Sequence, residues 1–285
     1  MLKTSLPVLC LLIAVLALPA TLTGIFSSSG PGPTEILSVR GTTVTLHGYG
    51  LYKHMSRDVA VQGIAQDWIS LAVIPVLLVA AFKARKGSLK AALIRNGTLL
   101  YFFLTYLFYL VMAMYNEMFL LYIALLGSSF FALVIAMHEK TPESIKASFS
   151  PCFNCTIPAI LLIVNAILIC LLWLSIIIPP LIQGQYPQGL DHYTTMIVQG
   201  LDLSLFLPAG VISGVLIARK HPLGYLLAPT YLVFLTILMS ALLAKLAGMA
   251  MTGTSIIPSI FIIPVILTAT TVTTWYSLHS VRTEK

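Results

Sequence analysis

The chain has 285 residues, a formal net charge of +7 at pH 7, 58% hydrophobic residues and only 9% charged residues. A soluble domain carries about a quarter charged residues, so this composition excludes a water-soluble globular protein of this length. Apolar runs of about 20 residues recur, which is long enough to cross a bilayer, and they do not alternate as β-barrel strands would. We therefore predict an all-α integral membrane protein.

The first apolar run extends from Leu6 to Phe26 and follows a short basic start that contains Lys3. We expect a retained transmembrane helix, because the run is longer than the apolar region of a signal peptide, which is about 7–15 residues. A cleaved signal peptide is the alternative interpretation, since small residues occur between positions 17 and 20.

A polar segment from Ser27 to Gln66 follows the first run. Within it, Ile36–Val39 and Thr42–Leu46 flank the pair Arg40-Gly41, a pattern that predicts two short strands around a turn. The segment is too short to form an independent domain, so we expect it to lie on the membrane face as a β-hairpin-like extracytoplasmic element.

Seven further apolar spans are predicted in chain order: Asp67–Phe82, Ala91–Met114, Met118–Met137, Ile157–Ile178, Ile197–Ala218, Leu223–Ala247 and Ile256–Leu278. The eight spans divide the chain into two four-helix halves, residues 1–138 and residues 157–285. A polar cytoplasmic linker, residues 139–156, joins the halves. Eight crossings place both termini on one side of the membrane.

The basic residues predict the orientation of the chain. With the N-terminus inside, the outer segments hold Arg40, Lys53 and Arg57, and Lys245 lies near the outer end of the seventh span. Because cytoplasmic loops are enriched in lysine and arginine, we expect cytoplasmic termini and an extracytoplasmic segment 27–66. Basic residues in short loops beside apolar runs do not indicate nucleic-acid binding. The inner loops and tails hold twelve basic residues: Lys3, Lys83, Arg85, Lys86, Lys90, Arg95, Lys140, Lys146, Arg219, Lys220, Arg282 and Lys285.

A short pattern occurs twice in the chain. Asp67-Trp-Ile-Ser-Leu precedes Ala84-Arg-Lys86, and Asp202-Leu-Ser-Leu precedes Ala218-Arg-Lys220, where the offset is 220 − 86 = 134. We interpret this as an internal duplication. An even number of spans in each copy predicts parallel repeats related by an axis along the membrane normal, with Asp67 and Asp202 at equal depth near the outer face.

Six short stretches of the chain carry a resemblance to known proteins: Ser38-Val-Arg-Gly41, Gly48-Tyr-Gly-Leu-Tyr52, Lys86-Gly-Ser-Leu89, Tyr115-Asn-Glu-Met-Phe-Leu-Leu-Tyr122, Gln199-Gly-Leu-Asp-Leu203 and Pro222-Leu-Gly-Tyr225. Through these stretches the chain resembles a family of uncharacterised prokaryotic multi-pass inner-membrane proteins. The resemblance implies a bacterial or archaeal inner-membrane protein and implies no activity.

Acidic residues are the first candidate site. Asp67, Asp202 and Glu117, with Asn116 beside it, map to the predicted outer ends of helices. Ionisable residues within membrane spans are costly and indicate function, so these residues predict a site for a cation, a proton or a basic substrate. Helix capping is the alternative, because an Asp at the start of a helix accepts hydrogen bonds from free backbone N–H groups.

Further polar residues lie within the predicted spans. Lys245 is expected either to pair with Asp202 or Glu117 or to extend its ammonium group toward the lipid headgroups. Tyr101 and Tyr109 share one face of the third span with Thr105, because the three recur every four residues. That face lines a polar cavity in one interpretation and makes hydrogen bonds between helices in the other.

No metal or cofactor is predicted. Cys152-Phe-Asn-Cys155 is a single C-x-x-C pair on an inner loop, where two free thiols are expected in a reducing compartment. A zinc site needs about four ligands, and only His138 and Glu139 lie on the same loop. The phosphate-binding, zinc-protease, nucleophile-elbow and dinucleotide motifs do not occur in the sequence.

The function predicted first is a small-solute or ion transporter, or a permease-like protein, with a polar site between the two halves near the outer leaflet. The alternative is a membrane sensor or accessory subunit that docks a protein partner through residues 27–66. An intramembrane enzyme fits least, because the histidines lie in loops or at helix ends and no catalytic residue stands out. The lipid bilayer of a prokaryotic cell membrane is the expected surrounding.

Overall fold

The computed structural model describes residues 2–187 and 189–282, with side chains from Ser5 onward. Within this part of the chain, eight helical segments are long and apolar enough to cross a membrane. The predicted helical class and the predicted number of long apolar helices are therefore confirmed. The segments are α1 (Leu2–Phe26), α2 (Arg57–Arg85), α3 (Leu89–Met112), α4 (Phe119–Met137), α6 (Thr156–Ile182), the joined α7–η1–α8 (Ile197–Ala218), α9 (Pro222–Met251) and α10 (Ser259–His279).

Local sequence fixes several helix starts. The side chain of Ser88 accepts a hydrogen bond from the Ala91 N–H at the start of α3, as an N-cap residue does. The short helix α5 (Pro142–Ala147) begins after Thr141, whose side chain accepts from the Ser144 N–H. Proline occupies the first helical position of α5 and α9, where its missing N–H is not needed.

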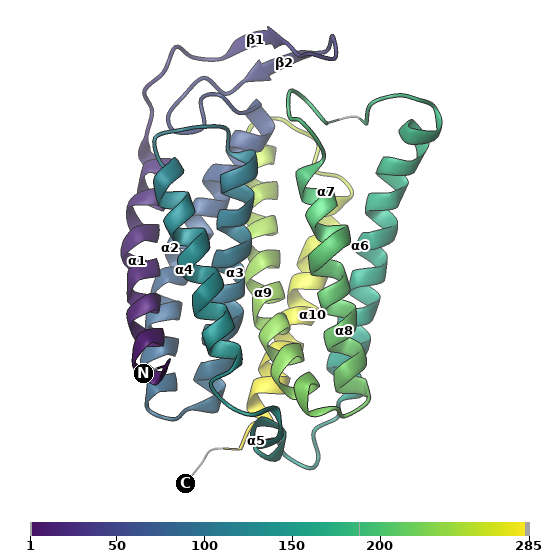
Figure 1. Ribbon diagram of the computed structural model, residues 1–285. Helices are drawn as coiled ribbons and strands as arrows, with labels where there is room; N and C mark the ends of the chain where they lie inside the picture. The colour runs from purple at the N-terminus through teal and green to yellow at the C-terminus, as the bar shows by residue number, and fades with distance from the viewer. Residues whose placement is uncertain (1, 188, 283–285) are drawn as a thin grey trace.

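The helices pack as two rings of four (Figure 1). In the first ring, α1 packs on α2, α2 on α3, α3 on α4, and α4 returns to α1. In the second ring, α6 packs on α8, α8 on α9, α9 on α10, and α10 returns to α6. Helix α9 also packs along α2 and α3, so it is the element that joins the two halves.

The polar segment after α1 forms the predicted strand pair. Strand β1 (Thr34–Leu37) runs antiparallel to β2 (Thr43–Leu46), with Thr34 opposite Leu46 and Leu37 opposite Thr43. The pair lies across one end of the bundle (Figure 1). The Arg40 guanidinium at the turn donates to the backbone oxygens of Asp191 and Thr194, which ties the hairpin to the loop before α7.

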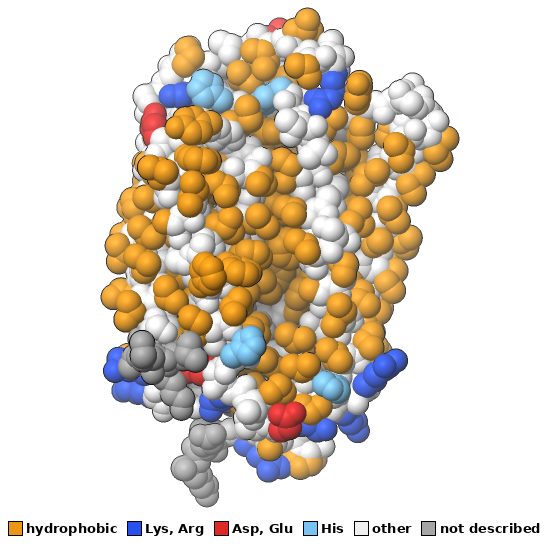
Figure 2. Space-filling view, in the orientation of Figure 1, with side chains coloured by type: hydrophobic (Ala, Val, Ile, Leu, Met, Phe, Trp, Pro, Cys, Tyr) orange, Lys and Arg blue, Asp and Glu red, His pale blue; other side chains and the backbone are white. Residues whose placement is uncertain are grey.

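The opposite end of the bundle carries most of the basic residues. Helix α1 begins and α10 ends there, and α5 lies there too (Figure 1). Figure 2 shows lysine and arginine side chains gathered at this end, below a broad hydrophobic surface. The polar belts at both ends and the apolar surface between them are the pattern of a protein with a lipid-facing middle.

Two predicted boundaries are wrong. The second span begins at Arg57 instead of Asp67, so the outer polar segment is ten residues shorter than expected and ends at Ser56.

Arg95 was expected in the basic inner loop, but it lies inside α3 and is 2% exposed. Its guanidinium pairs with the Glu139 carboxylate at 2.6 Å and donates to the Asn96 side chain. The pair neutralises a charge that burial would otherwise make costly.

A π-helical turn, Asp202–Phe206, interrupts the sixth span between α7 (Ile197–Leu201) and α8 (Leu207–Ala218). The Tyr231 hydroxyl of α9 donates to the Phe206 carbonyl oxygen at 2.7 Å. Such turns widen the helix locally and are frequent at functional sites. Asp202 is the first residue of this turn.

The contact between the halves depends on a glycine. A Cβ atom on Gly97 of α3 would lie 2.6 Å from the Thr230 carbonyl oxygen of α9 and against the Val233 side chain. Small residues at helix interfaces permit this kind of close backbone approach.

We predict that Gly97→Ala separates α3 from α9 and destabilises the protein by about 1–3 kcal/mol, the usual effect of overpacking. The matched control is Gly127→Ala in α4, where an added Cβ meets nothing within 4 Å. The control is expected to be neutral or slightly stabilising, because alanine favours helix more than glycine does. Thermal unfolding in lipid nanodiscs measures both. Equal melting temperatures for the two variants would contradict the close contact.

Candidate functional site

The Asp67 carboxyl lies at the centre of a buried polar cluster in the N-terminal half. Asp67 is 1% exposed and lies ten residues after the start of α2, about 15 Å along the helix at 1.5 Å per residue. Its backbone N–H is therefore not among the free groups at a helix start, and the capping interpretation is wrong for this residue. The side chain points into the bundle.

Two tyrosines hold the carboxylate oxygens. The Tyr52 hydroxyl donates to Asp67 Oδ2 at 2.6 Å. The Tyr109 hydroxyl lies 2.9 Å from both Asp67 Oδ1 and the Gly63 carbonyl oxygen, so its one hydrogen is shared between two acceptors. Burial, and the Asp67 carboxyl beside it, raise the pKa of the Tyr52 hydroxyl well above its usual value, which keeps the hydroxyl a donor.

Glycine at position 24 allows this arrangement. A Cβ atom on Gly24 of α1 would collide with the Asp67 carboxylate, and it would also lie 2.9 Å from the Tyr52 hydroxyl oxygen. The backbone of α1 is thus the wall against which the carboxyl and the tyrosine pack. A glycine here is required by close approach and not by the backbone conformation of the helix.

A second polar group on α2 consists of Gln66, the residue before Asp67, and Ser70, about one turn further along the helix. The Gln66 Nε2 donates to the hydroxyl oxygens of Tyr101, at 2.8 Å, and Thr105, at 3.1 Å. The Ser70 hydroxyl donates to the Gln66 carbonyl oxygen, so the Tyr101 hydroxyl donates its own hydrogen to Ser70. The Tyr101–Thr105–Tyr109 face of α3 therefore bonds α2, which confirms the interpretation of hydrogen bonds between helices over that of a cavity lining.

Aromatic rings close the cluster on its remaining sides. Tyr109 packs edge-on against Tyr52, Tyr106 and Tyr122, with ring centroids 5.4–6.0 Å apart. The Tyr106 hydroxyl and Gln66 Oε1 are buried and have no hydrogen-bond partner among the described residues. Unsatisfied polar atoms of this kind are rare in a tightly packed interior. The cluster therefore has hydrogen-bonding capacity that the described residues do not use.

The cluster contains a carboxyl group but no partner of opposite charge. The ion pairs in the described part of the chain are Lys53–Glu117 and Arg95–Glu139, and neither includes Asp67. Both side-chain donors to the carboxyl are neutral hydroxyls, and Asp67 is buried. A proton can bind such a carboxyl without moving a side chain.

Asp202 is held in the C-terminal half, away from Asp67. Its Oδ2 accepts a hydrogen bond from Trp173 Nε1 of α6 at 2.9 Å. Asp202 follows the start of α7 by five residues, so helix capping is wrong for this residue as well. All hydrogen-bond partners of the Asp67 carboxyl come from the N-terminal half. The structure therefore does not bring the two acids together in one site.

Lys245 interacts electrostatically with Asp202 across the interface of α9 and the π-helical turn. No ion pair within 4.0 Å joins them in the part of the chain that the structure describes. Lys245 does not pair with Glu117 either, because Glu117 lies in an exposed turn and contacts Lys53 at 3.7 Å. Neither of the two ion pairs expected for Lys245 is therefore present among the described residues, and only a longer-range attraction to Asp202 is found.

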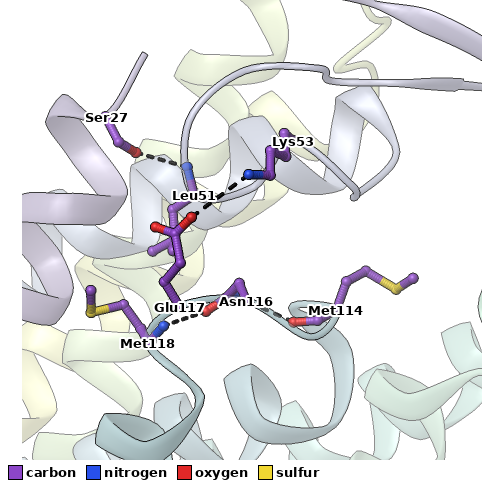
Figure 3. A network of polar contacts seen from close by, with 7 residues as sticks. All are labelled: Ser27, Leu51, Lys53, Met114, Asn116, Glu117 and Met118. Atoms are coloured by element: carbon purple, nitrogen blue, oxygen red, sulfur yellow. Dashed lines mark hydrogen bonds and ion pairs between the residues drawn. The ribbon is translucent and has the colours of Figure 1, made fainter. Parts of the chain in front are cut away.

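Asn116 shapes the turn between α3 and α4 (Figure 3). Its side-chain oxygen accepts from the Met118 N–H at 2.9 Å, and its nitrogen donates to the backbone oxygens of Ala113 and Met114. Met114 adopts a positive φ of 57°, which is unusual for a side chain of this size. Asn116 and Glu117 therefore lie in the turn at the hairpin end of the bundle and not with Asp67.

The other candidate groups stay apart. Cys152 is exposed, whereas Cys155 is buried with its sulfur 3.3 Å from the Tyr225 hydroxyl, so the two thiols do not form a joint site. Among residues 2–187 and 189–282, no group of three or more histidine, cysteine, aspartate or glutamate side chains could hold a metal ion.

Comparison with known proteins gives no relative: no protein-family model, no curated protein and no solved structure matches this chain. The function is therefore inferred from the arrangement of the chain's own residues.

We predict that Tyr52→Phe destabilises the protein by about 1–3 kcal/mol, because it removes one of two donors from a buried carboxyl group. The matched control is Tyr49→Phe, since Tyr49 lies on the same loop but is 44% exposed. Chemical or thermal unfolding in detergent measures the difference. A Tyr52→Phe protein as stable as the Tyr49→Phe protein would show that the Tyr52–Asp67 hydrogen bond contributes nothing.

Proposed function

We propose that this chain is a multi-pass membrane protein that moves a small solute or ion, and that Asp67 is its proton-binding group. The observation that carries the proposal is a fully buried carboxyl held by two tyrosine hydroxyls, with no cation partner among the described residues. Ionisable residues in membrane spans are costly to keep and are usually functional.

The protonation of the Asp67 carboxyl is governed by its burial away from water. An ionised carboxyl buried without a cation costs several kcal/mol, and uptake of a proton removes that cost. A conformation that opens Asp67 to water would allow the carboxyl to release the proton. Asp67 can therefore couple proton exchange to opening and closing of the bundle, which is what a proton-driven transporter requires.

Helix α9 is the element that connects this exchange to the rest of the molecule. It packs along α2 and α3, which carry Asp67 and Tyr109, and it also belongs to the second ring. It carries Lys245, whose ammonium group is attracted electrostatically by the Asp202 carboxylate on the π-helical turn. Movement of α2 against α9 would change the surroundings of both acids, so the two halves are proposed to move relative to each other.

We propose a prokaryotic cell membrane as the location, with both termini in the cytoplasm. The end of the bundle opposite the hairpin carries nine exposed or partly exposed basic residues, namely Lys83, Arg85, Lys86, Lys90, Lys140, Lys146, Arg219, Lys220 and Arg282. The hairpin end carries Arg40, Lys53 and Arg57. This imbalance supports cytoplasmic termini. Trp68, half exposed and packed on Phe26, suits the outer lipid interface and lies next to Asp67 in α2, at nearly the same depth.

The two four-helix halves are proposed to be parallel repeats. The third span of each half, α3 and α9, packs against its counterpart, and α2 packs on α9 while α3 touches α7. Reciprocal pairings of this kind are what a two-fold axis between the halves would produce. The matching Ala-Arg-Lys triplets after α2 and α8 support the same relation.

The test is solute uptake into proteoliposomes that have an acidic exterior. The probe is a panel of amino acids, monosaccharides, carboxylic acids and monovalent metal ions, with uptake measured by mass spectrometry. We expect at least one class to accumulate with the wild-type protein and Asp67→Asn to reduce its uptake by about tenfold or more, since Asn cannot exchange a proton. Asp191→Asn is the control, because Asp191 has a left-handed φ of 49° that Asn tolerates.

Uptake that is equal for wild type and Asp67→Asn, or wild-type vesicles that take up nothing in the panel, would overturn transport driven by Asp67. In the second case the accessory or sensor role becomes the better account. One observation favours that role: Leu37 and Val39 at the hairpin are 74% and 95% exposed. A pair of apolar side chains held out from an extracytoplasmic hairpin suits a protein partner.

A further inference from the structure

A hollow of about 370 Å³ lies at the hairpin end of the bundle, above the start of α4. Pockets that hold small molecules begin at about this size. Its polar lining comes from Lys53, His54, Asn116 and Glu117, and its apolar lining includes Leu51 and Phe119. Figure 2 shows acidic, basic and histidine side chains close together on this end of the molecule.

The charged groups of the hollow are paired only loosely. Lys53 Nζ lies 3.7 Å from Glu117 Oε1, and the Glu117 side chain is 73% exposed. An exposed pair at this distance adds little stability, so either partner can turn to a ligand at small cost. Figure 3 shows the two side chains reaching toward each other from the loop after the hairpin and from the α3–α4 turn.

The backbone that carries these groups is held firmly. The Leu51 N–H donates to the Ser27 hydroxyl at 2.7 Å, and Asn116 closes its turn with three hydrogen bonds. The positive φ values of Gly48 and Gly50, 79° and 57°, set the loop that presents Lys53. Charged side chains on a fixed backbone are a preorganised pair of binding groups.

The same loop reaches the Asp67 cluster. Leu51 and Lys53 line the hollow, while Tyr52 between them points the opposite way and donates to Asp67. The Tyr122 hydroxyl lies near both Tyr52 and Asn116 without a hydrogen bond to either. Lys53 therefore lies next in the chain to the residue that closes the carboxyl site.

We propose that this hollow binds a small zwitterion, a molecule with an ammonium group and an acid group a few bonds apart. The Glu117 carboxylate accepts from the ammonium group, Lys53 donates to the acid group, and the apolar part lies on Leu51 and Phe119. A free amino acid and the ethanolamine headgroup of a phospholipid share this chemistry. That the zwitterion is the transported solute rests on the proposed transport function; its binding in the hollow does not.

The probe is leucine, titrated by calorimetry into the full-length protein in nanodiscs that contain only phosphatidylglycerol. Two single-charge analogues serve as references: isoamylamine, which lacks the acid group, and 4-methylpentanoate, which lacks the ammonium group. We expect leucine to bind at least about tenfold more tightly than either analogue, since one lost charge-assisted hydrogen bond corresponds to about 1.4 kcal/mol or more.

Lys53→Ala and Glu117→Gln are each expected to weaken leucine binding about tenfold or more. Lys86→Ala and Glu35→Gln are the matched controls, because both side chains are exposed and lie outside the hollow. The lipid arm measures retention of phosphatidylethanolamine by native mass spectrometry after purification from mixed-lipid nanodiscs, with the same four variants.

Either leucine or phosphatidylethanolamine bound in a way that depends on Lys53 and Glu117 supports the zwitterion site and identifies its source. Absence of binding in both arms, or binding unchanged in Lys53→Ala and Glu117→Gln, overturns it. Solute uptake that depends on Asp67 without binding in the hollow would overturn this inference alone. Binding without any uptake would overturn only the transport function.

Discussion

A carboxyl group placed inside an apolar bundle is the constraint on which the N-terminal half depends. Its oxygens need donors, and none of the described lysine, arginine or histidine side chains forms an ion pair with it. Tyr109 of α3 and Tyr52 of the outer loop meet this need, and Gly24 of α1 leaves the space for it. One side chain of α2 thereby fixes the positions of two helices and the outer segment.

The outer segment is consequently part of the bundle. Tyr52 is 1% exposed although it belongs to a loop, and the strand pair is tied through Arg40 to the loop before α7. The loop after the hairpin can therefore close the Asp67 site and line the outer hollow at once. This arrangement places exposed charged groups at the hairpin end close in sequence to a residue that contacts the buried Asp67 carboxyl.

The surroundings of Asp67 in the N-terminal half differ from those of Asp202 in the C-terminal half. Asp67 is enclosed by neutral hydroxyls, whereas Asp202 is only partly buried, accepts from an indole N–H and lies within the electrostatic reach of Lys245. If the halves are repeats, the surroundings of the two corresponding acids have diverged since the duplication. Helix α9 lies between the two environments and contacts both.

The spans and the strand pair were predictable because they follow from run length and turn residues. The start of α2 was not, because Arg57, Asp58 and Gln62 make its first turns as polar as a loop. Only packing against α1, α3 and α9 turns that polar stretch into a helix. Tertiary contacts of this kind override local composition.

The residues around Asp67 were predictable in part. The spacing of Tyr101 and Tyr109 indicated a polar face on one helix, and the structure places α2 against it. Tyr52 and Gly24 gave no signal, since a tyrosine in a loop and a glycine in an apolar run are ordinary, and their roles arise from contacts distant in sequence. Arg95 was misplaced because it follows a dense cluster of basic residues between positions 83 and 90 and was counted with them.

Infrared difference spectroscopy on the purified protein in lipid tests the central claim most directly. A buried Asp67 that binds a proton gives the C=O stretching band of a neutral carboxyl group at neutral pH, shifted by exchange into D₂O and missing from Asp67→Asn. If wild type and Asp67→Asn have the same spectrum in this region, Asp67 holds no proton and the account of its role is contradicted.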